Sequence, residues 1–412
     1  MGMIINIDEA LKNRTDYNVL KEPLHAMMRA QQEAWEKENP IDMIFNRGSL
    51  SSFQETYTSS IGFAHAFSET ADYSVGPIFN TAEGFAATYR TRTFQGSFII
   101  TKQVLEDGNY GQVKDTASQF VKRWHGDIVD YAMKSLEGGF TAAGTQWVSG
   151  DGGVTKLLLN SADTVDGKID NPVKNSLFSA SHKTVARDDA APITQSNIFA
   201  PDTTIDLAGS DAGKISKLAM LIDQVVTQME NYKDDNGKYA AVNGRKTIVC
   251  ANDPILKAAI KTALEGDMFK HGESMDINPA YDRCDFRYTP YLNDIGPTAN
   301  RAGFFIVDKG YNAENHGLEL TERIPFTLEV IENKRPYGII YDGRERFDIN
   351  VATWRGIAYV SLTAATEGKI SVTVNGSTAS VDASTVSVGA TIVKEVEVVN
   401  PSTSPVQTTV VS

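Results

Sequence analysis

The most regular stretch of the chain begins at Val113 and reads VKDTASQFVKRWHGDIVDYAMKSLEGG, ending at Gly139. Its apolar residues recur at intervals of three and four, which is the spacing of one face of an α-helix. The pair Gly138–Gly139 then stops the pattern. The spacing predicts a long amphipathic helix that packs one face on a second layer. The residues of that face are Val113, Ala117, Phe120, Val121, Trp124, Ile128, Ala132, Met133 and Leu136.

Residues 51–97, before this helix, are rich in aromatic residues separated by Gly, Ser and Thr. From Phe85 to Phe94 the side chains alternate, which predicts one continuous strand of a long β-hairpin. The alternation puts Tyr89, Thr91 and Thr93 on one side and Arg90, Arg92 and Phe94 on the other. A hairpin with few aliphatic residues has little core of its own, so we expect it to lie on a neighbouring molecule.

The first 50 residues are polar and helix-forming, with one narrow apolar stripe that ends before Asn39-Pro40. One stripe cannot support a domain, so this segment is predicted to be an arm that packs on another surface. The stripe consists of Leu20, Leu24, Met27, Met28 and Trp35.

The middle of the chain predicts a compact α/β unit. A helix is expected at residues 214–232, followed by a buried strand at Lys246–Ala251. Asp253 is the expected N-cap of a third helix with Pro254 in its first turn. A further strand is expected at Phe304–Asp308.

After residue 324 the pattern has a period of two, which predicts an antiparallel sheet up to Leu362 with a turn at Asp342-Gly343. Residues 367–412 contain no aromatic residue and consist largely of Val, Thr, Ser and Gly. They are expected to form a small β-appendage or an extended tail, because they lack the side chains to fill a core.

Composition narrows the class of protein. The 412 residues carry a formal net charge of -13, which is not the basic footprint of a dedicated nucleic-acid binder. The two cysteines, Cys250 and Cys284, have no CxxC spacing and are expected to be buried thiols. No signal peptide and no apolar run of membrane-spanning length is evident, which predicts a soluble protein made in the cytoplasm, without a membrane partner.

Local motifs for catalysis or ligand binding fail on inspection. Gly150–Gly153 lacks the third glycine of a dinucleotide loop, and Gly209–Lys214 is one residue too short for a phosphate loop. A calcium loop around Asp234–Gly237 would place Tyr232 at a ligand position that needs an acid. The six histidines are scattered singly. We therefore predict no catalytic residue, no cofactor, no metal site and no enzymatic activity.

Several motifs occur in an order that resembles a known family. They are Asn175–His182 (NSLFSASH), Ser196–Phe199 (SNIF), Gln228-Met229, Lys233–Lys238 (KDDNGK), Lys246–Cys250 (KTIVC) and Asn252–Leu256 (NDPIL). The series resembles the major head subunit of Mu-type phages, within the tailed-bacteriophage major capsid proteins, over residues 50–362. It departs from that family at Ala251–Pro254, where paired prolines are usual.

The resemblance implies an α+β fold of the tailed-phage major capsid type. Its parts would be an N-terminal arm (1–50), an E-loop β-hairpin (51–97), a P-domain spine helix (98–150), an α/β A-domain (151–323), a P-domain antiparallel sheet (324–366) and a β-rich tail (367–412).

The implied function is structural. Copies of the chain would assemble into pentamers and hexamers of an icosahedral head shell around double-stranded DNA, which they contact non-specifically. A portal protein is an implied partner, and the virion capsid, assembled in the bacterial cytoplasm, is the implied location. The expected intersubunit contacts are Met27, Met28, Trp35, Phe63, Phe67, Tyr73, Phe79, Phe85 and Tyr89.

Two alternatives remain open at this stage. One is the shell protein of a cellular nanocompartment, which would enclose enzymes instead of DNA. The other is an α/β enzyme or binding protein whose site forms only on folding, which would require a deep pocket. Because only about 50 residues precede the hairpin, we also expect a separate scaffolding protein.

Some relatives cross-link their shells through a lysine in the E-loop, but residues 51–97 contain no lysine. We therefore predict that boiled particles run as a single monomer band on a denaturing gel. A ladder of covalent oligomers would contradict this prediction.

Overall fold

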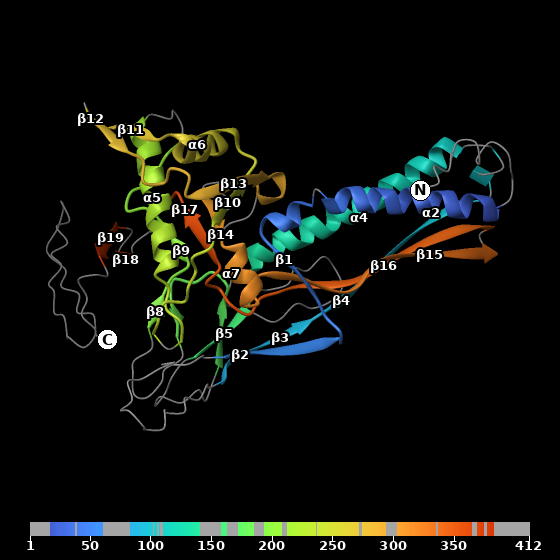
Figure 1. Cartoon of the computed structure of the whole chain (residues 1–412), viewed down its shortest axis with the longest axis horizontal. Coiled ribbons are helices and arrows are strands. Elements are labelled where there is room, and N and C mark those ends of the chain that lie inside the picture. Colours follow the sequence, from blue (N-terminus) through green and yellow to red (C-terminus); the bar gives the residue numbers. More distant parts are fainter. Residues whose placement is uncertain are drawn as a thin grey trace, which may run out of the picture. The chain divides into compact units, whose positions relative to one another are not determined.

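The structure, a computed structural model, separates residues 1–363 from residues 364–412 as two compact units (Figure 1). It describes residues 17–37, 39–60, 83–101, 103–104, 107, 110–140, 158–162, 172–184, 193–207, 212–235, 237–271, 274–293, 303–334, 337–364, 369–374 and 377–382.

A four-stranded sheet and one long helix form the first layer pair of the larger unit. The strand order is β1 (Asn46–Ser49), β15 (Glu319–Lys334), β16 (Tyr337–Asn350) and β4 (Arg92–Thr101). β1 runs parallel to β15, and the other pairs are antiparallel. Helix α4 (Tyr110–Gly138) packs its apolar face on this sheet, which confirms the long amphipathic helix.

Two glycines bring α4 close to the sheet. The register places Gly96 of β4 opposite Gly343 of β16. A Cβ atom at Gly96 would lie 3.2 Å from the ring of Trp124, and one at Gly343 would lie 3.2 Å from the ring of Phe120. The predicted turn at Asp342-Gly343 is therefore wrong: Gly343 lies inside β16 and makes room for aromatic rings.

The predicted continuous strand through residue 91 is also wrong. β3 (Glu83–Arg90) pairs with β2 (Gln54–Ser60) in a separate two-stranded sheet, whereas β4 joins β16. Thr91 is buried but Thr93 is exposed, so the expected alternation breaks between the two strands. The physical reason is the change of partner strand at Thr91, whose N–H donates to Phe53 O at 3.4 Å.

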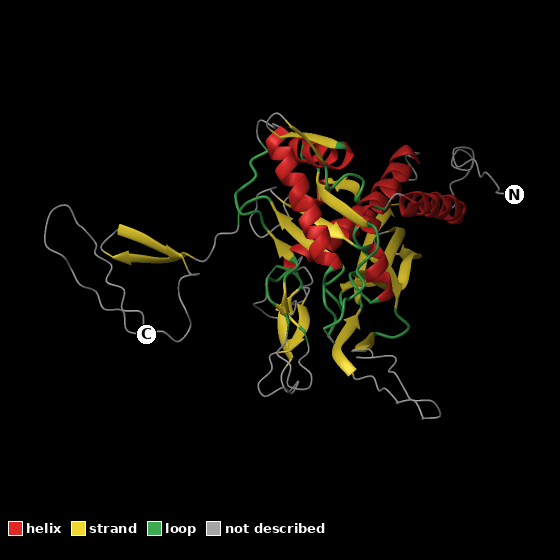
Figure 2. Ribbon diagram, turned by 60° about the vertical axis from the view of Figure 1, so that its left-hand side comes forward, coloured by secondary structure: helices red, strands yellow, loops and turns green. Residues whose placement is uncertain are grey.

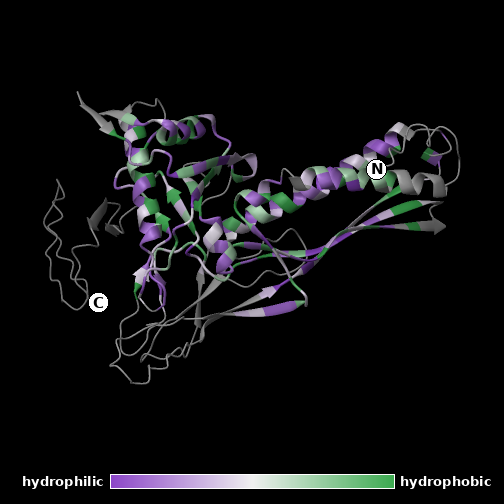
Figure 3. Ribbon diagram, in the orientation of Figure 1, coloured by the Kyte–Doolittle hydropathy of each residue, from purple (hydrophilic) through white to green (hydrophobic). Residues whose placement is uncertain are grey.

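The α/β unit contains a mixed five-stranded sheet. Figure 3 shows hydrophobic residues in the strands of this unit. The apolar residues of β10 (Lys246–Ala251) and β14 (Gly303–Val307) are almost fully buried. Helices α5 (Ala212–Glu230) and α6 (Pro254–Glu265) pack against it. The sheet has the order β13 (Cys284–Thr289), β10 (Lys246–Ala251), β14 (Gly303–Val307), β17 (Ile357–Ser361) and β9 (Ile198–Phe199).

Local signals placed these elements well, with two corrections. Asp253 caps α6 by accepting hydrogen bonds from the N–H groups of Ile255 and Leu256, as predicted. Asp308, however, follows β14 and caps α7 (Lys309–Glu314). β17 belongs to the five-stranded sheet and not to the antiparallel sheet predicted from residue 324 onward, because it pairs with β14 and β9.

The N-terminal helix α2 (Tyr17–Lys37) lies beside α4 (Figure 2). Leu24 and Met28 are buried in one cluster with Val113, Ala117 and Val121 of α4. The surface that the arm was expected to need is therefore supplied by its own subunit. A hydrogen bond of 2.7 Å from Gln31 Nε2 to Ser118 Oγ also joins α2 to α4.

The remaining elements are short. They are the 3-10 helices η1 (Pro40–Met43) and η2 (Pro290–Leu292), and the antiparallel pairs β5 (Leu158–Ala162) with β6 (Pro172–Ser176), β7 (His182–Lys183) with β8 (Thr194–Gln195), and β11 (Met268–His271) with β12 (Ser274–Ile277). The smaller unit contains the antiparallel pair β18 (Lys369–Val374) and β19 (Ser377–Asp382), consistent with a β-appendage.

The close approach of aromatic rings to Gly343 predicts that a side chain at this position lowers the stability of the fold. In Gly343→Val the new side chain would press on Phe120 and on Phe326, whose Cε2 lies 3.0 Å from the Cβ position. We expect the free energy of unfolding in urea to fall by about 1–3 kcal/mol. The matched control is Gly111→Ala in the first turn of α4, where a Cβ meets nothing within 4 Å. Equal stability of both variants would contradict the account.

Candidate functional sites

Two of the motifs quoted above, Asn175–His182 and Ser196–Phe199, contact each other in the core of the α/β unit. Asn197 is fully buried and donates from Nδ2 to the carbonyls of Leu177 at 2.8 Å and Ile357 at 3.2 Å. His182 Nε2 lies 3.1 Å from Asn197 Oδ1, and its ring stacks on Trp354 at 4.3 Å. Because these contacts join segments far apart in the chain, the two motifs serve the core of the α/β unit and offer no open ligand site.

The Lys233–Lys238 turn is also held from within. Arg355 donates from Nε to the Lys233 carbonyl at 2.9 Å and pairs through Nη2 with Asp235 Oδ1 at 3.1 Å. The side chain of Gln195 makes hydrogen bonds to both the N–H and the carbonyl of Lys233. The interpretation as a polar turn is thus consistent with the contacts.

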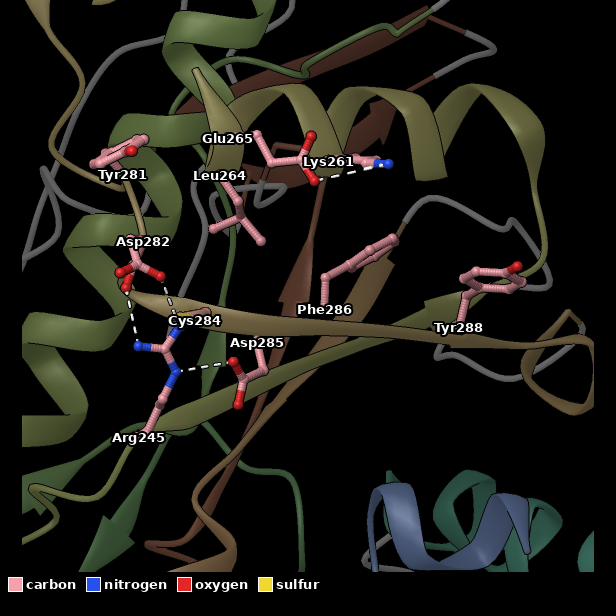
Figure 4. A pocket seen from close by; sticks show the side chains of 10 residues that line it. All are labelled: Arg245, Lys261, Leu264, Glu265, Tyr281, Asp282, Cys284, Asp285, Phe286 and Tyr288. Atoms are coloured by element: carbon pink, nitrogen blue, oxygen red, sulfur yellow. Dashed lines mark hydrogen bonds and ion pairs between the residues drawn. The ribbon is translucent and has the colours of Figure 1, made fainter. Parts of the chain in front are cut away.

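A cavity of about 540 Å³ lies beside the edge strand β13, under α6 (Figure 4). Its charges are paired: Arg245 bonds to Asp282 and Asp285 at 2.8 Å each, and Lys261 lies 3.7 Å from Glu265. Burial raises the pKa of the Cys284 thiol to about 12, which keeps the sulfur protonated and weakly nucleophilic at neutral pH. The lining therefore contains no activated nucleophile beside a base.

The described residues contain no group of three or more His, Cys, Asp or Glu side chains that could hold a metal ion. Among the described helices, none is long and apolar enough to cross a membrane. Cys250 and Cys284 are both buried free thiols, as expected.

The predicted contact residues fall into four groups. Met28 and Tyr89 are each 1% exposed. Both side chains are packed inside the subunit. Met27 and Trp35 are half-buried on α2. Phe85 lies in β3. The other four, Phe63, Phe67, Tyr73 and Phe79, lie outside the described residues.

Sequence reasoning missed an apolar row on the face of the four-stranded sheet opposite α4. The register aligns Ile331 with Ile340 and Ile340 with Ile99 across three strands. Ile331 is 48% exposed and Ile99 is 39% exposed. The three isoleucines belong to three different strands, so only the strand register could reveal the row.

Comparison with protein-family models finds no match, and comparison with curated proteins finds none either. Solved structures do match. "The capsid of Myoviridae Phage XM1" has 10% identity and a TM-score of 0.42, covering 77% of this chain and 88% of that chain. The "capsid of native GTA particle" has 13% identity and a TM-score of 0.41, covering 79% of this chain and 90% of the other.

A third match is the "virus-like particle from Pyrococcus furiosus", at 10% identity with a TM-score of 0.37, covering 81% of this chain and 96% of that chain. The matched structures are two capsids and a virus-like particle. Superposition at these TM-scores is partial, so the function has to be inferred from the residues of the chain itself.

His125 is buried in the contact between α2 and α4. It is 3% exposed, its ring stacks on Trp35 at 4.0 Å, and neither ring nitrogen has a hydrogen-bond partner among the described residues. Burial lowers the pKa of His125 to about 4, and burial also lowers that of His182 to about 4. Both imidazoles are therefore neutral in the folded chain at pH 7.

These shifts predict a loss of stability in acid. Between pH 6.5 and pH 4 the unfolded chain binds protons that the folded chain excludes, so the free energy of unfolding falls as pH falls through this window. Each histidine would contribute a loss on the order of 1–3 kcal/mol. We expect His125→Phe to flatten part of the decline in urea unfolding from pH 7 to 4.5. The exposed Lys122→Ala on the same helix is the control, and an unchanged slope in His125→Phe would refute the assignment.

Proposed function

We propose that the chain is the shell-forming subunit of a tailed-phage capsid, with a structural and non-catalytic role. In this proposal copies assemble into pentamers and hexamers that close into an icosahedral head around double-stranded DNA. The proposal combines the order of sequence motifs with the surfaces that the subunit leaves uncovered.

The observation that carries the proposal is the hairpin β2–β3. The hairpin forms a two-stranded sheet of its own. The next strand along the chain, β4, pairs with β16 in the four-stranded sheet and does not extend the hairpin. An isolated two-stranded hairpin is marginally stable in water. A second copy lying against it would supply the missing contact, and a shell repeats that contact between all neighbours.

The Ile99–Ile340–Ile331 row is the surface that we propose is covered in the assembled shell. Beside it on the same face lies a row in which Asp342 pairs in register with Glu329 and Ser97. An apolar centre with a polar margin is the usual composition of a protein interface. Met27 and Trp35 remain proposed contacts on the arm.

The proposed partners beyond the chain itself are a scaffolding protein, a portal protein and the packaged DNA. The net charge of -13 favours non-specific over tight DNA contact. The six-part division of the chain and a virion location, after assembly in the host cytoplasm, belong to the same proposal. DNA inside purified particles would separate this function from that of a nanocompartment shell.

The test is a charge placed in the isoleucine row. Ile331→Lys should fold, because surface substitutions typically change stability by less than about 0.5 kcal/mol. We expect it to abolish closed particles in sedimentation when it is co-expressed with its genomic neighbours. Met220→Lys, at a 61% exposed residue of α5, is the matched control and should assemble. Normal assembly of Ile331→Lys would overturn the proposed surface.

A further inference from the structure

Both strands of the hairpin β2–β3 contact one residue of the subunit body, His316. The register pairs Glu55 with Tyr89, so these two residues and Tyr57 share one face of the hairpin. The ring of Tyr57 lies 4.3 Å from the imidazole of His316. The hydroxyl of Tyr89 donates to the carbonyl of His316 at 2.8 Å. A hydrogen bond of 3.0 Å from Tyr57 to Glu55 Oε2 orients the tyrosine.

The body holds His316 from the other side. Its carbonyl also accepts the N–H of Ala352 at 2.9 Å, directly after the end of β16. Its Nδ1 lies 3.5 Å from Oε1 of Glu319, the first residue of β15, whose side chain is only 11% exposed. The imidazole, 47% exposed, therefore lies between a largely buried carboxylate and the hairpin.

The backbone of His316 is unusual as well. Its φ of 50° lies in the left-handed region, which residues other than glycine seldom adopt. Helices commonly end in one residue of this conformation. His316 follows the C-cap Asn315 of α7, and the N–H of Gly317 donates to the Asn312 carbonyl at 2.8 Å, so the end of α7 fixes the backbone of His316 beside the hairpin.

We propose that His316 is a positioning residue that fixes the direction in which hairpin β2–β3 leaves the subunit, and thereby where the hairpin meets a neighbouring copy. The second clause rests on the proposed shell function. A strand of seven residues spans roughly 23 Å, so a small rotation at its base displaces its far end by several ångströms. The contact between the tilted rings of Tyr57 and His316 restricts that rotation, and the shared carbonyl fixes the base.

The experiment compares variants of the full chain by amide hydrogen exchange on unassembled subunits. His316→Asn removes the ring but keeps a residue that tolerates a left-handed backbone. We expect amides of β2 and β3 to exchange about tenfold faster, while those of β15 and β16 and the midpoint of urea unfolding stay unchanged. A general loss of structure would instead accelerate all four strands.

Two further variants make the result specific. Tyr57→Leu removes the ring contact from the hairpin side and leaves the body intact, so it should accelerate the same amides even if His316→Asn fails to fold. Ala241→Gly relaxes another left-handed residue, with φ of 56°, and should change neither hairpin exchange nor assembly. Wild-type exchange of the hairpin in both His316→Asn and Tyr57→Leu would overturn the proposal.

Assembly is scored separately, so that the two proposals can fail independently. Where the wild-type chain forms closed particles, His316→Asn should give fewer of them and a broader range of diameters. Normal particles from a variant with a loosened hairpin would overturn the role in assembly. If the wild-type chain forms no particles, the shell function fails, and the exchange data still decide whether His316 positions the hairpin.

Discussion

The close contact between helix α4 and the four-stranded sheet is the constraint on which the larger unit depends. Gly96 and Gly343 are register partners on the adjacent strands β4 and β16. Because neither has a side chain, the rings of Trp124 and Phe120 can lie close to the sheet. Trp124 Nε1 also donates to Glu345 Oε2 at 2.7 Å, which fixes the indole along the sheet. This contact positions β4, and among the described residues the hairpin strands β2 and β3 pair with each other alone.

That arrangement separates a well-packed body from parts that extend from it. The body has a continuous core running from η1 through the C-terminal half of α4 and into the five-stranded sheet. The hairpin is tied to it through His316, and α2 is tied through a smaller cluster and the Trp35–His125 stack. A shell needs rigid subunits whose extensions can reach neighbours at differing angles, and this division supplies both.

The sequence predicted elements where local chemistry decides the structure. The spacing of α4, the Asp253 cap of α6 and the buried strand β10 were all correctly inferred. The predictions from the sequence were wrong where the structure depends on which strands pair. Gly343 resembles a turn residue but serves ring packing, and Thr91 marks a change of partner that alternation cannot reveal. The isoleucine row and the His316 cluster both depend on register, which no single segment contains.

The central claim is that copies of this chain build a closed shell, and electron microscopy of the purified protein tests it most directly. The protein should be imaged alone and after co-expression with its genomic neighbours. The account predicts closed icosahedral particles, or rings of five or six subunits, in at least one of these samples. A discrete monomer or dimer under every condition would contradict it and return attention to the cavity beside β13.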